Sequence, residues 1–113
     1  MNPTGARAER RARLFYLLRG YRLLGANVRP GGVEVDLVLR RGRQLVFCEV
    51  KAKLGKRFGD PVEMVGREKQ QRLRRAAEAW LAEHPEAAEW EVRFDVVAVT
   101  PRGLVRVPNA FGS

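Results

Sequence analysis

Apolar residues recur every three or four positions over residues 5–19 of the chain. They are Ala8, Ala12, Phe15 and Leu18. This spacing predicts an amphipathic α-helix with an arginine-rich opposite face, with Thr4 able to cap its start and Gly20 at its end.

The next residues change to a strand pattern. Tyr21–Val28 is a short mixed stretch that predicts an edge strand, stopped by Pro30–Gly32. Two stretches rich in β-branched residues, Val33–Leu39 and Gln44–Lys51, flank the tight-turn sequence Arg40–Arg43. They predict an antiparallel hairpin.

The second half of the chain repeats the alternation of helix and strands. Residues 52–61 form a basic stretch with glycine and proline, which predicts a mobile loop near a ligand. Helical spacing between residues 62 and 84 predicts a long helix. Its apolar positions are Val65, Leu73, Ala76, Ala77, Trp80 and Leu81. Trp90–Val99 and Leu104–Val107 predict a second hairpin.

The predicted order is therefore helix, three strands, helix and two strands. Because amphipathic helices bury their apolar faces against a sheet, this order predicts an α/β or α+β arrangement in which two main helices cover a central mixed sheet. A length of 113 residues suits a single domain over residues 1–113.

The charge of the chain indicates what kind of partner it binds. The chain carries a formal net charge of +9, and its only lysines are Lys51, Lys53, Lys56 and Lys69, so most of its cations are arginines. The planar guanidinium binds phosphate through two hydrogen bonds, which favours nucleic acid as the partner. An anionic membrane surface, or a charge that serves only solubility, is the alternative.

Other functional classes are excluded by what the sequence lacks. The single cysteine, Cys48, cannot form an internal disulfide, and the single histidine, His84, cannot supply a zinc site of the Cys/His kind. Oxygen atoms must therefore hold any metal. The apolar runs are too short to span a bilayer and the N-terminal residues are charged, so we expect a cytoplasmic protein that is not inserted in a membrane.

Candidate chemistry lies on the predicted first hairpin. Side chains of a strand alternate between faces, so Glu34 and Asp36 are expected on one face, with Val33, Val35 and Leu37 on the other. In the partner strand the same rule places Phe47, Glu49 and Lys51 opposite the apolar residues Val46, Cys48 and Val50. The two charged faces can meet across the hairpin.

Such a cluster suits a hard divalent cation, because Mg²⁺ takes carboxylate oxygens, water and phosphate oxygens as ligands. Asp36 and Glu49 are the expected metal ligands. Lys51 would lie beside them and could help to activate water or stabilise charge on phosphorus, which predicts metal-assisted phosphodiester hydrolysis. The alternative is a solvated cross-strand ion pair with no catalytic role.

Several motifs in the same order resemble the YraN-like family, uncharacterised protein family 0102. They are GARAERRA, GGVEVDLVLRRG, LVFCEVKAK, FGDPVEMV, RFDVVAV and VPNAF, and they span nearly the whole chain. That family is similar to the PD-(D/E)XK restriction-endonuclease-like superfamily and to archaeal Holliday-junction resolvases. The resemblance implies a restriction-endonuclease-like α/β core, Mg²⁺- or Mn²⁺-dependent cleavage of branched or structured DNA, and a homodimer.

Residue by residue, the resemblance assigns catalytic positions to Glu9, Asp36, Glu49 and Lys51. Glu9 corresponds to the acid of the first helix, and a charge that only favours the helix dipole at the helix start is the alternative interpretation. Glu34 and Asp95 are supporting candidates, and Asp95 is more simply an ion-pair partner. The predicted contacts with nucleic acid are Arg7, Arg10, Arg11, Lys53, Lys56, Arg57, Lys69 and Arg72.

These observations leave three functional hypotheses open. The first is a metal-dependent endonuclease acting on branched DNA. The second is a nucleic-acid-binding protein that keeps the nuclease fold and does not cut. The third is an interaction module whose charge serves RNA or ribosome association, and this one does not require the acids to cluster.

Overall fold

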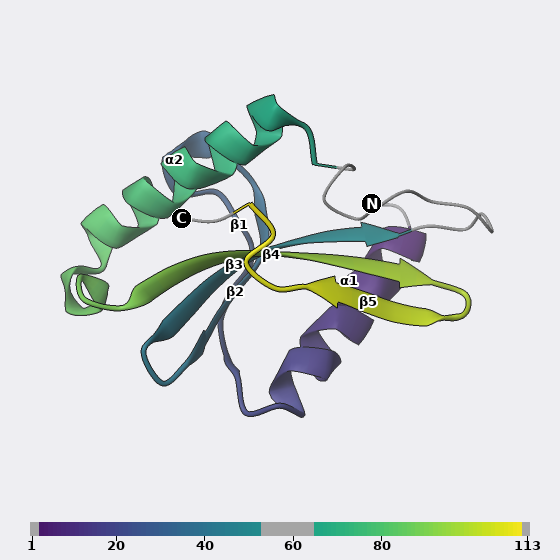
Figure 1. Cartoon of the computed structure of the whole chain (residues 1–113). Helices are drawn as coiled ribbons and strands as arrows, with labels where there is room; N and C mark the ends of the chain where they lie inside the picture. The colour runs from purple at the N-terminus through teal and green to yellow at the C-terminus, as the bar shows by residue number, and fades with distance from the viewer. Residues whose placement is uncertain (1–2, 53–64, 112–113) are drawn as a thin grey trace.

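The computed structural model describes residues 3–52 and 65–111 (Figure 1). Its elements are α1 (Pro3–Leu17), β1 (Arg22–Val28), the 3₁₀ turn η1 (Pro30–Gly32), β2 (Val35–Arg41), β3 (Gln44–Ala52), α2 (Arg67–Glu83), the 3₁₀ turn η3 (Pro85–Ala87), β4 (Glu91–Thr100) and β5 (Gly103–Val107). The predicted α/β class and the predicted order of helices and strands are confirmed.

The strands form one mixed sheet in the order β1-β2-β3-β4-β5. Only the pairing of β3 with β4 is parallel, because α2 connects these two strands as a crossover. β3 is central and pairs with β4 along its whole length, from Gln44↔Glu91 to Ala52↔Val99. β1 lies at one edge, as predicted.

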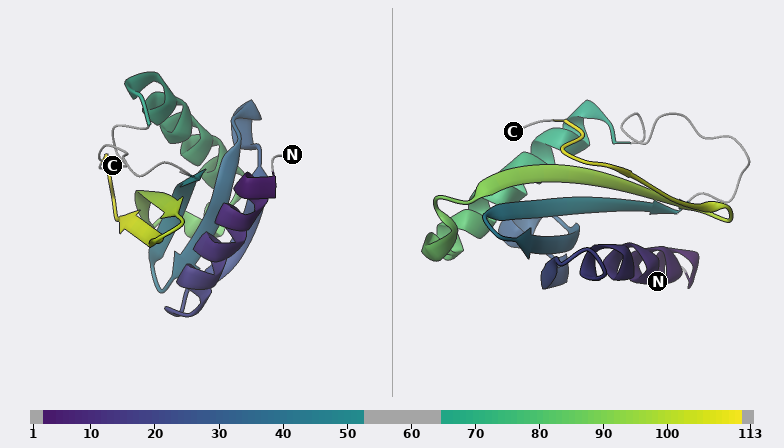
Figure 2. Two further views of the ribbon diagram at one scale, coloured as in Figure 1. Left: turned by 90° about the vertical axis from the view of Figure 1, so that its right-hand side faces the viewer. Right: turned by 60° about the horizontal axis from the view of Figure 1, so that its bottom comes forward.

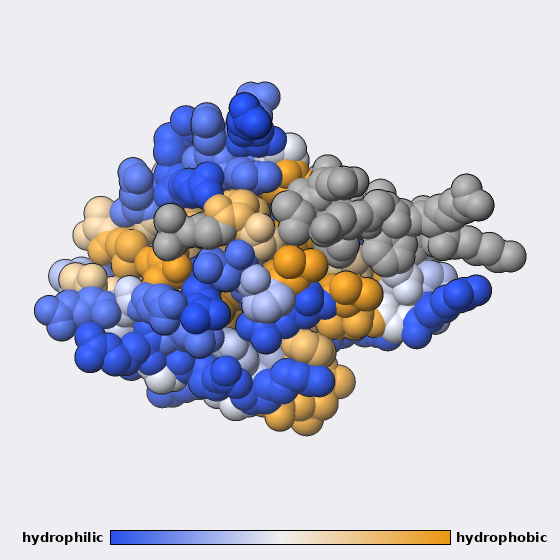
Figure 3. All heavy atoms as spheres, in the orientation of Figure 1, coloured by the Kyte–Doolittle hydropathy of each residue, from blue (hydrophilic) through white to orange (hydrophobic). Residues whose placement is uncertain are grey.

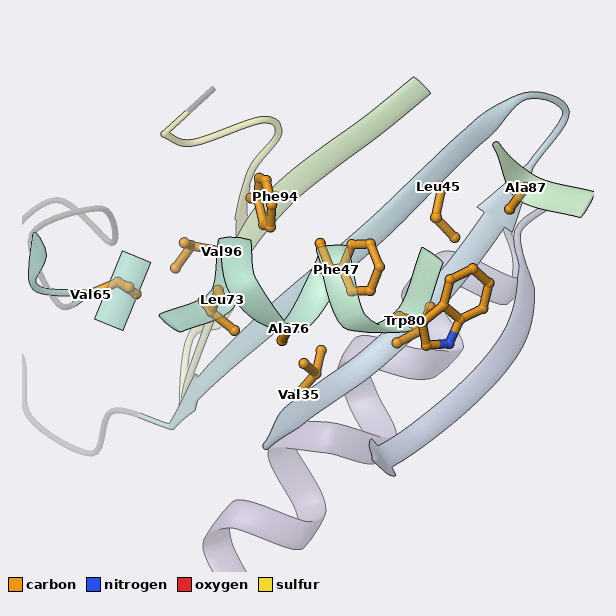
Figure 4. Packing of buried hydrophobic residues seen from close by; sticks show 12 residues of the cluster. Val35, Leu45, Phe47, Val65, Leu73, Ala76, Trp80, Ala87, Phe94 and Val96 are labelled. Carbon is orange, nitrogen blue, oxygen red and sulfur yellow. The ribbon is translucent and has the colours of Figure 1, made fainter. Parts of the chain in front are cut away.

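Each helix covers one face of the sheet (Figure 2). Leu37, Leu39, Val46 and Cys48 are buried in the cluster that includes Ala8, Ala12 and Tyr16 of α1. Phe47, Phe94 and Val96 are buried with Leu73, Ala76 and Trp80 of α2 (Figure 4). The central strands are therefore buried on both sides, and Cys48 belongs to the core.

The ends of α1 differ from the prediction. The helix begins at Pro3, so Thr4 lies inside it and is not its cap. It ends at Leu17, which leaves Leu18 outside the helix and 74% exposed, although the spacing had placed Leu18 on the apolar face. Tyr16, one turn after Ala12, is buried instead. Gly20, with φ of 86°, allows Tyr21 N–H to reach the carbonyl of Tyr16 at 3.1 Å and closes the helix end.

α2 is shorter than predicted at its start. Gly66 precedes its first residue, Arg67, and Val65 is buried just before the helix. Val62, the predicted start, and most of the predicted loop at 52–61 lie outside the described residues. Within the ranges 3–52 and 65–111 there is no helix long and apolar enough to cross a membrane.

Candidate functional site

The strands β2 and β3 stop pairing beside Asp36. Their antiparallel register runs from Arg41↔Gln44 to Leu37↔Cys48 and ends there. The backbone N–H of Val50 donates instead to Oδ2 of Asp36, at 2.7 Å. The Asp36 carboxyl group thus replaces a main-chain partner where the two strands separate.

The alternation of β2 breaks at the same residue. Val35 is buried in the cluster under α2, whereas Leu37 is buried under α1. The prediction that these two side chains share one face is therefore wrong. In β1, Asn27 lies between the residues that pair with Val35 and Leu37, and its φ of 52° is left-handed. The left-handed residue of β1 thus lies beside the break in β2, where β2 has also stopped pairing with β3.

β3 keeps its predicted alternation. Phe47 faces α2, Cys48 faces α1, and Glu49 contacts Lys69 on α2. The predicted charged face of this strand is confirmed, because Oε2 of Glu49 lies 3.8 Å from Nζ of Lys51. The regular pattern holds here because β4 pairs with β3 along the whole length of β3.

Asp36 and Glu49 form a pair of buried carboxyl groups. Asp36 is 9% exposed and Glu49 is 4% exposed. Burial, and then the charge and hydrogen bonding of the nearby Glu49 carboxyl, raise the pKa of Asp36 to about 7. The hydrogen bond from Val50 N–H opposes this rise but does not cancel it. Placing two negative charges here is costly, and a bound cation would relieve the cost.

Lys69 is the second cation at this pair. Its Nζ lies 3.0 Å from Oε2 of Glu49, closer than Lys51, although the sequence analysis had assigned it only to nucleic acid. The spacing of residues in the sequence does indicate that Lys69 faces the sheet. Lys69 precedes Leu73 by one helical turn, and Leu73 is a core residue, so both lie on the sheet side of α2.

Glu9 reaches the site from α1. The helix begins at Pro3, so Glu9 lies in the second turn, beyond the first turn where the helix dipole acts most strongly. The amide Nδ2 of Asn27 donates to Oε1 of Glu9 at 2.9 Å. The charge of Glu9 also contributes, as a small effect, to the raised pKa of Asp36. Sequence reasoning missed Asn27, whose only signal is the tolerance of asparagine for left-handed backbone.

The two supporting candidates lie in different surroundings. Glu34 is on the surface and pairs with Arg29 at 3.2 Å. Asp95 is 1% exposed and pairs with Arg106 at 2.9 Å. Asp95 also accepts a 2.6 Å hydrogen bond from the hydroxyl of Tyr16, so it is tied to the α1 side of the core.

The predicted nucleic-acid contacts are mostly on the helices. Arg7, Arg10 and Arg11 are exposed on α1, and Arg72 is exposed on α2. The first half of α1 lies beside the C-terminal end of β3 (Figures 1 and 2). Lys53, Lys56 and Arg57 lie outside the described residues.

A divalent cation fits the carboxyl pair. Among residues 3–52 and 65–111 no group of three or more His, Cys, Asp or Glu side chains is placed to hold a metal, so the donors are two carboxyl groups. Mg²⁺ commonly takes one or two carboxylates and completes its shell with water and phosphate oxygens. Asp36 and Glu49 would hold such an ion, and its charge would offset their repulsion.

The raised pKa predicts an unusual pH dependence of stability. The ordinary pKa of Asp36 is 3.8, and in the folded state it is about 7, so between these values the folded protein binds more protons than the unfolded chain. In metal-free buffer the free energy of unfolding should therefore fall as the pH rises through this window, by up to about 4 kcal/mol.

Urea denaturation at several pH values, in the presence of a chelator, measures this dependence. Asp36→Asn is the matched control, because it keeps the shape of the side chain and cannot ionise. In this variant the free energy of unfolding should fall much less with rising pH than it does in the wild type. A wild-type stability that rises with pH over the same window would contradict the assignment.

Comparison with known proteins agrees with the resemblance seen in the motifs. Residues 8–99 match the family model described as Uncharacterised protein family UPF0102. The chain is 43% identical over 109 residues to a UPF0102 protein of Rhodopseudomonas palustris (strain BisB18), which covers 96% of this chain and 79% of the relative. It is 51% identical over 96 residues to the UPF0102 protein FRAAL5785 of Frankia alni, covering 83% of this chain and 79% of the relative.

Proposed function

The chain belongs to the Uncharacterised protein family UPF0102, and we propose that it is a metal-dependent endonuclease that hydrolyses phosphodiester bonds in branched or otherwise structured DNA. The observation that carries the proposal is the buried carboxyl pair of Asp36 and Glu49, with the ammonium of Lys51 at 3.8 Å from Glu49. Acidic side chains are rarely buried unless they have an ion-pair partner or a function. This pair lies beside a lysine at the end of a strand.

Each residue of the site has a role in this chemistry. Asp36 and Glu49 would hold Mg²⁺ or Mn²⁺, and the ion would polarise the phosphate and make water a better nucleophile. The Val50 N–H bond fixes the orientation of Asp36 before any ligand arrives. The side chain of Lys51 is 34% exposed, so its ammonium can reach a phosphate from the solvent side and donate a proton to developing charge.

The substrate class follows from charge and from the family resemblance. A net charge of +9 favours a polyanion, and arginines on both helices lie on the surface around the site. Branched DNA and a homodimer follow from the resemblance to Holliday-junction resolvases. A cytoplasmic location accords with such a substrate and with the reduced thiol of Cys48.

A cleavage assay tests the proposal. Labelled junction, flap, nicked and linear DNA are incubated with the protein and Mn²⁺, and parallel reactions contain EDTA. We expect cleavage that requires the metal and that favours the junction or the flap. Asp36→Asn, purified identically, should not cut, which excludes a contaminating nuclease. If the wild type cuts none of the substrates, the endonuclease proposal is wrong.

One observation favours a second function, a nucleic-acid-binding protein without catalysis. Lys69 lies 3.0 Å from Glu49 and can neutralise it without a metal, and the described residues supply no third carboxyl ligand. Calorimetric titration with Mn²⁺ separates the two functions. If the protein is a metal-dependent endonuclease, Mn²⁺ should give a heat of binding that Asp36→Asn abolishes. If it only binds nucleic acid, no heat of Mn²⁺ binding is expected.

A further inference from the structure

A groove lies between η1 and the first half of α2, on the side of α2 that faces away from β4. It has a volume of about 420 Å³. Among the residues that the structure describes, its cationic lining consists of Arg29, Lys69, Arg72 and Arg75, against a single carboxyl group, that of Glu34. In Figure 1, η1 lies behind α2, and Figure 3 shows hydrophilic side chains gathered over α2.

The groove is a fixed part of the fold. Gly31 of η1 packs so closely on α2 that a Cβ added to it would lie 3.1 Å from Cβ of Ala79. Arg72, Arg75 and Ala79 are spaced three and four residues apart, so they share one stripe of the helix, and this stripe faces η1. The contact at Ala79 therefore holds the two arginines over the groove.

The arginines of the groove can exchange their present partners for phosphate. Arg29 pairs with Glu34 and Arg72 pairs with Glu68, but both pairs are on the surface, where an ion pair contributes little free energy. Arg75 has no ion-pair partner within the described residues. A charge-assisted bond from a guanidinium to a phosphate is stronger than these surface pairs.

The groove leads to the carboxyl pair. Lys69 belongs both to its lining and to the site, because its Nζ lies 3.0 Å from Glu49. Lys69, Arg72 and Arg75 follow one another at intervals of three residues, a row of about 9 Å along the helix. A row of this length spans neighbouring phosphates of one nucleic-acid strand.

We propose that the groove between η1 and α2 binds the sugar–phosphate backbone of one nucleic-acid strand next to the phosphodiester at Asp36 and Glu49. The inference rests on the proposed function and names where its substrate lies. A concave row of cations suits a linear chain of phosphates. A membrane surface would require apolar side chains to insert, and the described lining offers only that of Val33.

The test compares two double variants that lose the same charge. Arg72→Gln/Arg75→Gln removes two groove cations, and Arg22→Gln/Arg43→Gln removes two exposed cations at the start of β1 and in the β2–β3 turn. Binding to labelled junction, duplex and single-stranded DNA is measured by fluorescence anisotropy in EDTA at several salt concentrations. Thermal denaturation verifies that both variants fold.

The groove variant should bind DNA about tenfold more weakly than the wild type, and the slope of log Kd against log salt should decrease by about two. The control variant should change the affinity by less than about threefold. Arg72→Lys/Arg75→Lys should keep most of the salt slope, because it keeps the charge. Equal losses in the two glutamine variants would overturn the proposal. So would a groove variant that loses binding to vesicles containing phosphatidylserine while it keeps its affinity for DNA.

Binding and cleavage are measured separately, so the two proposals can fail independently. A wild type that binds through the groove but never cuts would leave this inference standing and remove the endonuclease. A wild type that cuts, with a groove variant that binds like the control, would leave the endonuclease standing and remove the groove.

Discussion

Lys51→Ala is expected to lower the rate of cleavage of a branched DNA by about 10²–10⁴-fold, the range for losing a positioned proton-transfer group. Its affinity for DNA should change little, because Lys51 is one of 22 lysines and arginines in the chain. Its ammonium lies 3.8 Å from Glu49, as that of Lys69 does at 3.0 Å, and charge would develop there during the proposed hydrolysis. Single-turnover cleavage with Mn²⁺, together with anisotropy on the same DNA, separates rate from affinity.

Two further variants define the role of this lysine. Lys51→Arg keeps the positive charge but cannot release a proton, so it should bind DNA normally and remain slow if proton transfer is the role. Arg72→Gln should do the reverse, losing affinity more than rate. A Lys51→Ala variant whose rate falls only in proportion to its affinity would show that this residue is a phosphate contact.

The sequence predicted the site best where the backbone is regular. β3 pairs with β4 along its whole length, so the two-residue period of its side chains holds through Phe47 and Glu49. β2 loses its period at Asp36, where β3 has stopped pairing and Asn27 turns left-handed on the other side. Periodicity describes a regular strand only, and a functional residue often stands where the strand is irregular.

The helices show a second limit of periodicity. The apolar spacing of α1 extends through Leu18, but the helix closes at Gly20 and releases Leu18 to solvent. Tyr16 is buried instead because its hydroxyl finds a partner in the core. A spacing rule that counts only apolar residues cannot identify a tyrosine whose burial depends on a hydrogen bond to a distant aspartate.

The pairing of Asp95 with Arg106 was not predicted from the sequence either. The register of β4 and β5 would have indicated it. Arg106 pairs with Val97 across the β4–β5 hairpin, so it is the diagonal neighbour of Asp95 on the same face. Its guanidinium Nε lies 2.9 Å from Oδ2 of Asp95. Arg93 lies two residues before Asp95 on the same strand, but its side chain pairs with Glu91.

Asp95→Ala is expected to lower the free energy of unfolding by about 3–5 kcal/mol, because it leaves buried partners without their acceptor. The carboxylate accepts bonds from the hydroxyl of Tyr16 at 2.6 Å, from Arg106 at 2.9 Å and from the backbone N–H of Asn109 at 2.9 Å. These bonds join α1, β4, β5 and the segment after β5. Urea denaturation followed by circular dichroism measures the loss.

A double-mutant cycle with Arg106→Leu distinguishes the ion pair from simple loss of packing. Burial and the charge of Asp95 raise the pKa of the Tyr16 hydroxyl, so the phenol stays protonated and remains a donor. Burial lowers the pKa of the Arg106 guanidinium, but the charge and the hydrogen bond of Asp95 raise it by more, so Arg106 also keeps its charge. When both charges are removed, no buried ion remains uncompensated, and the double variant should recover part of the stability lost in Asp95→Ala. Strictly additive losses would mean that Asp95 acts through its packing and its bonds to Tyr16 and Asn109, without coupling to the arginine.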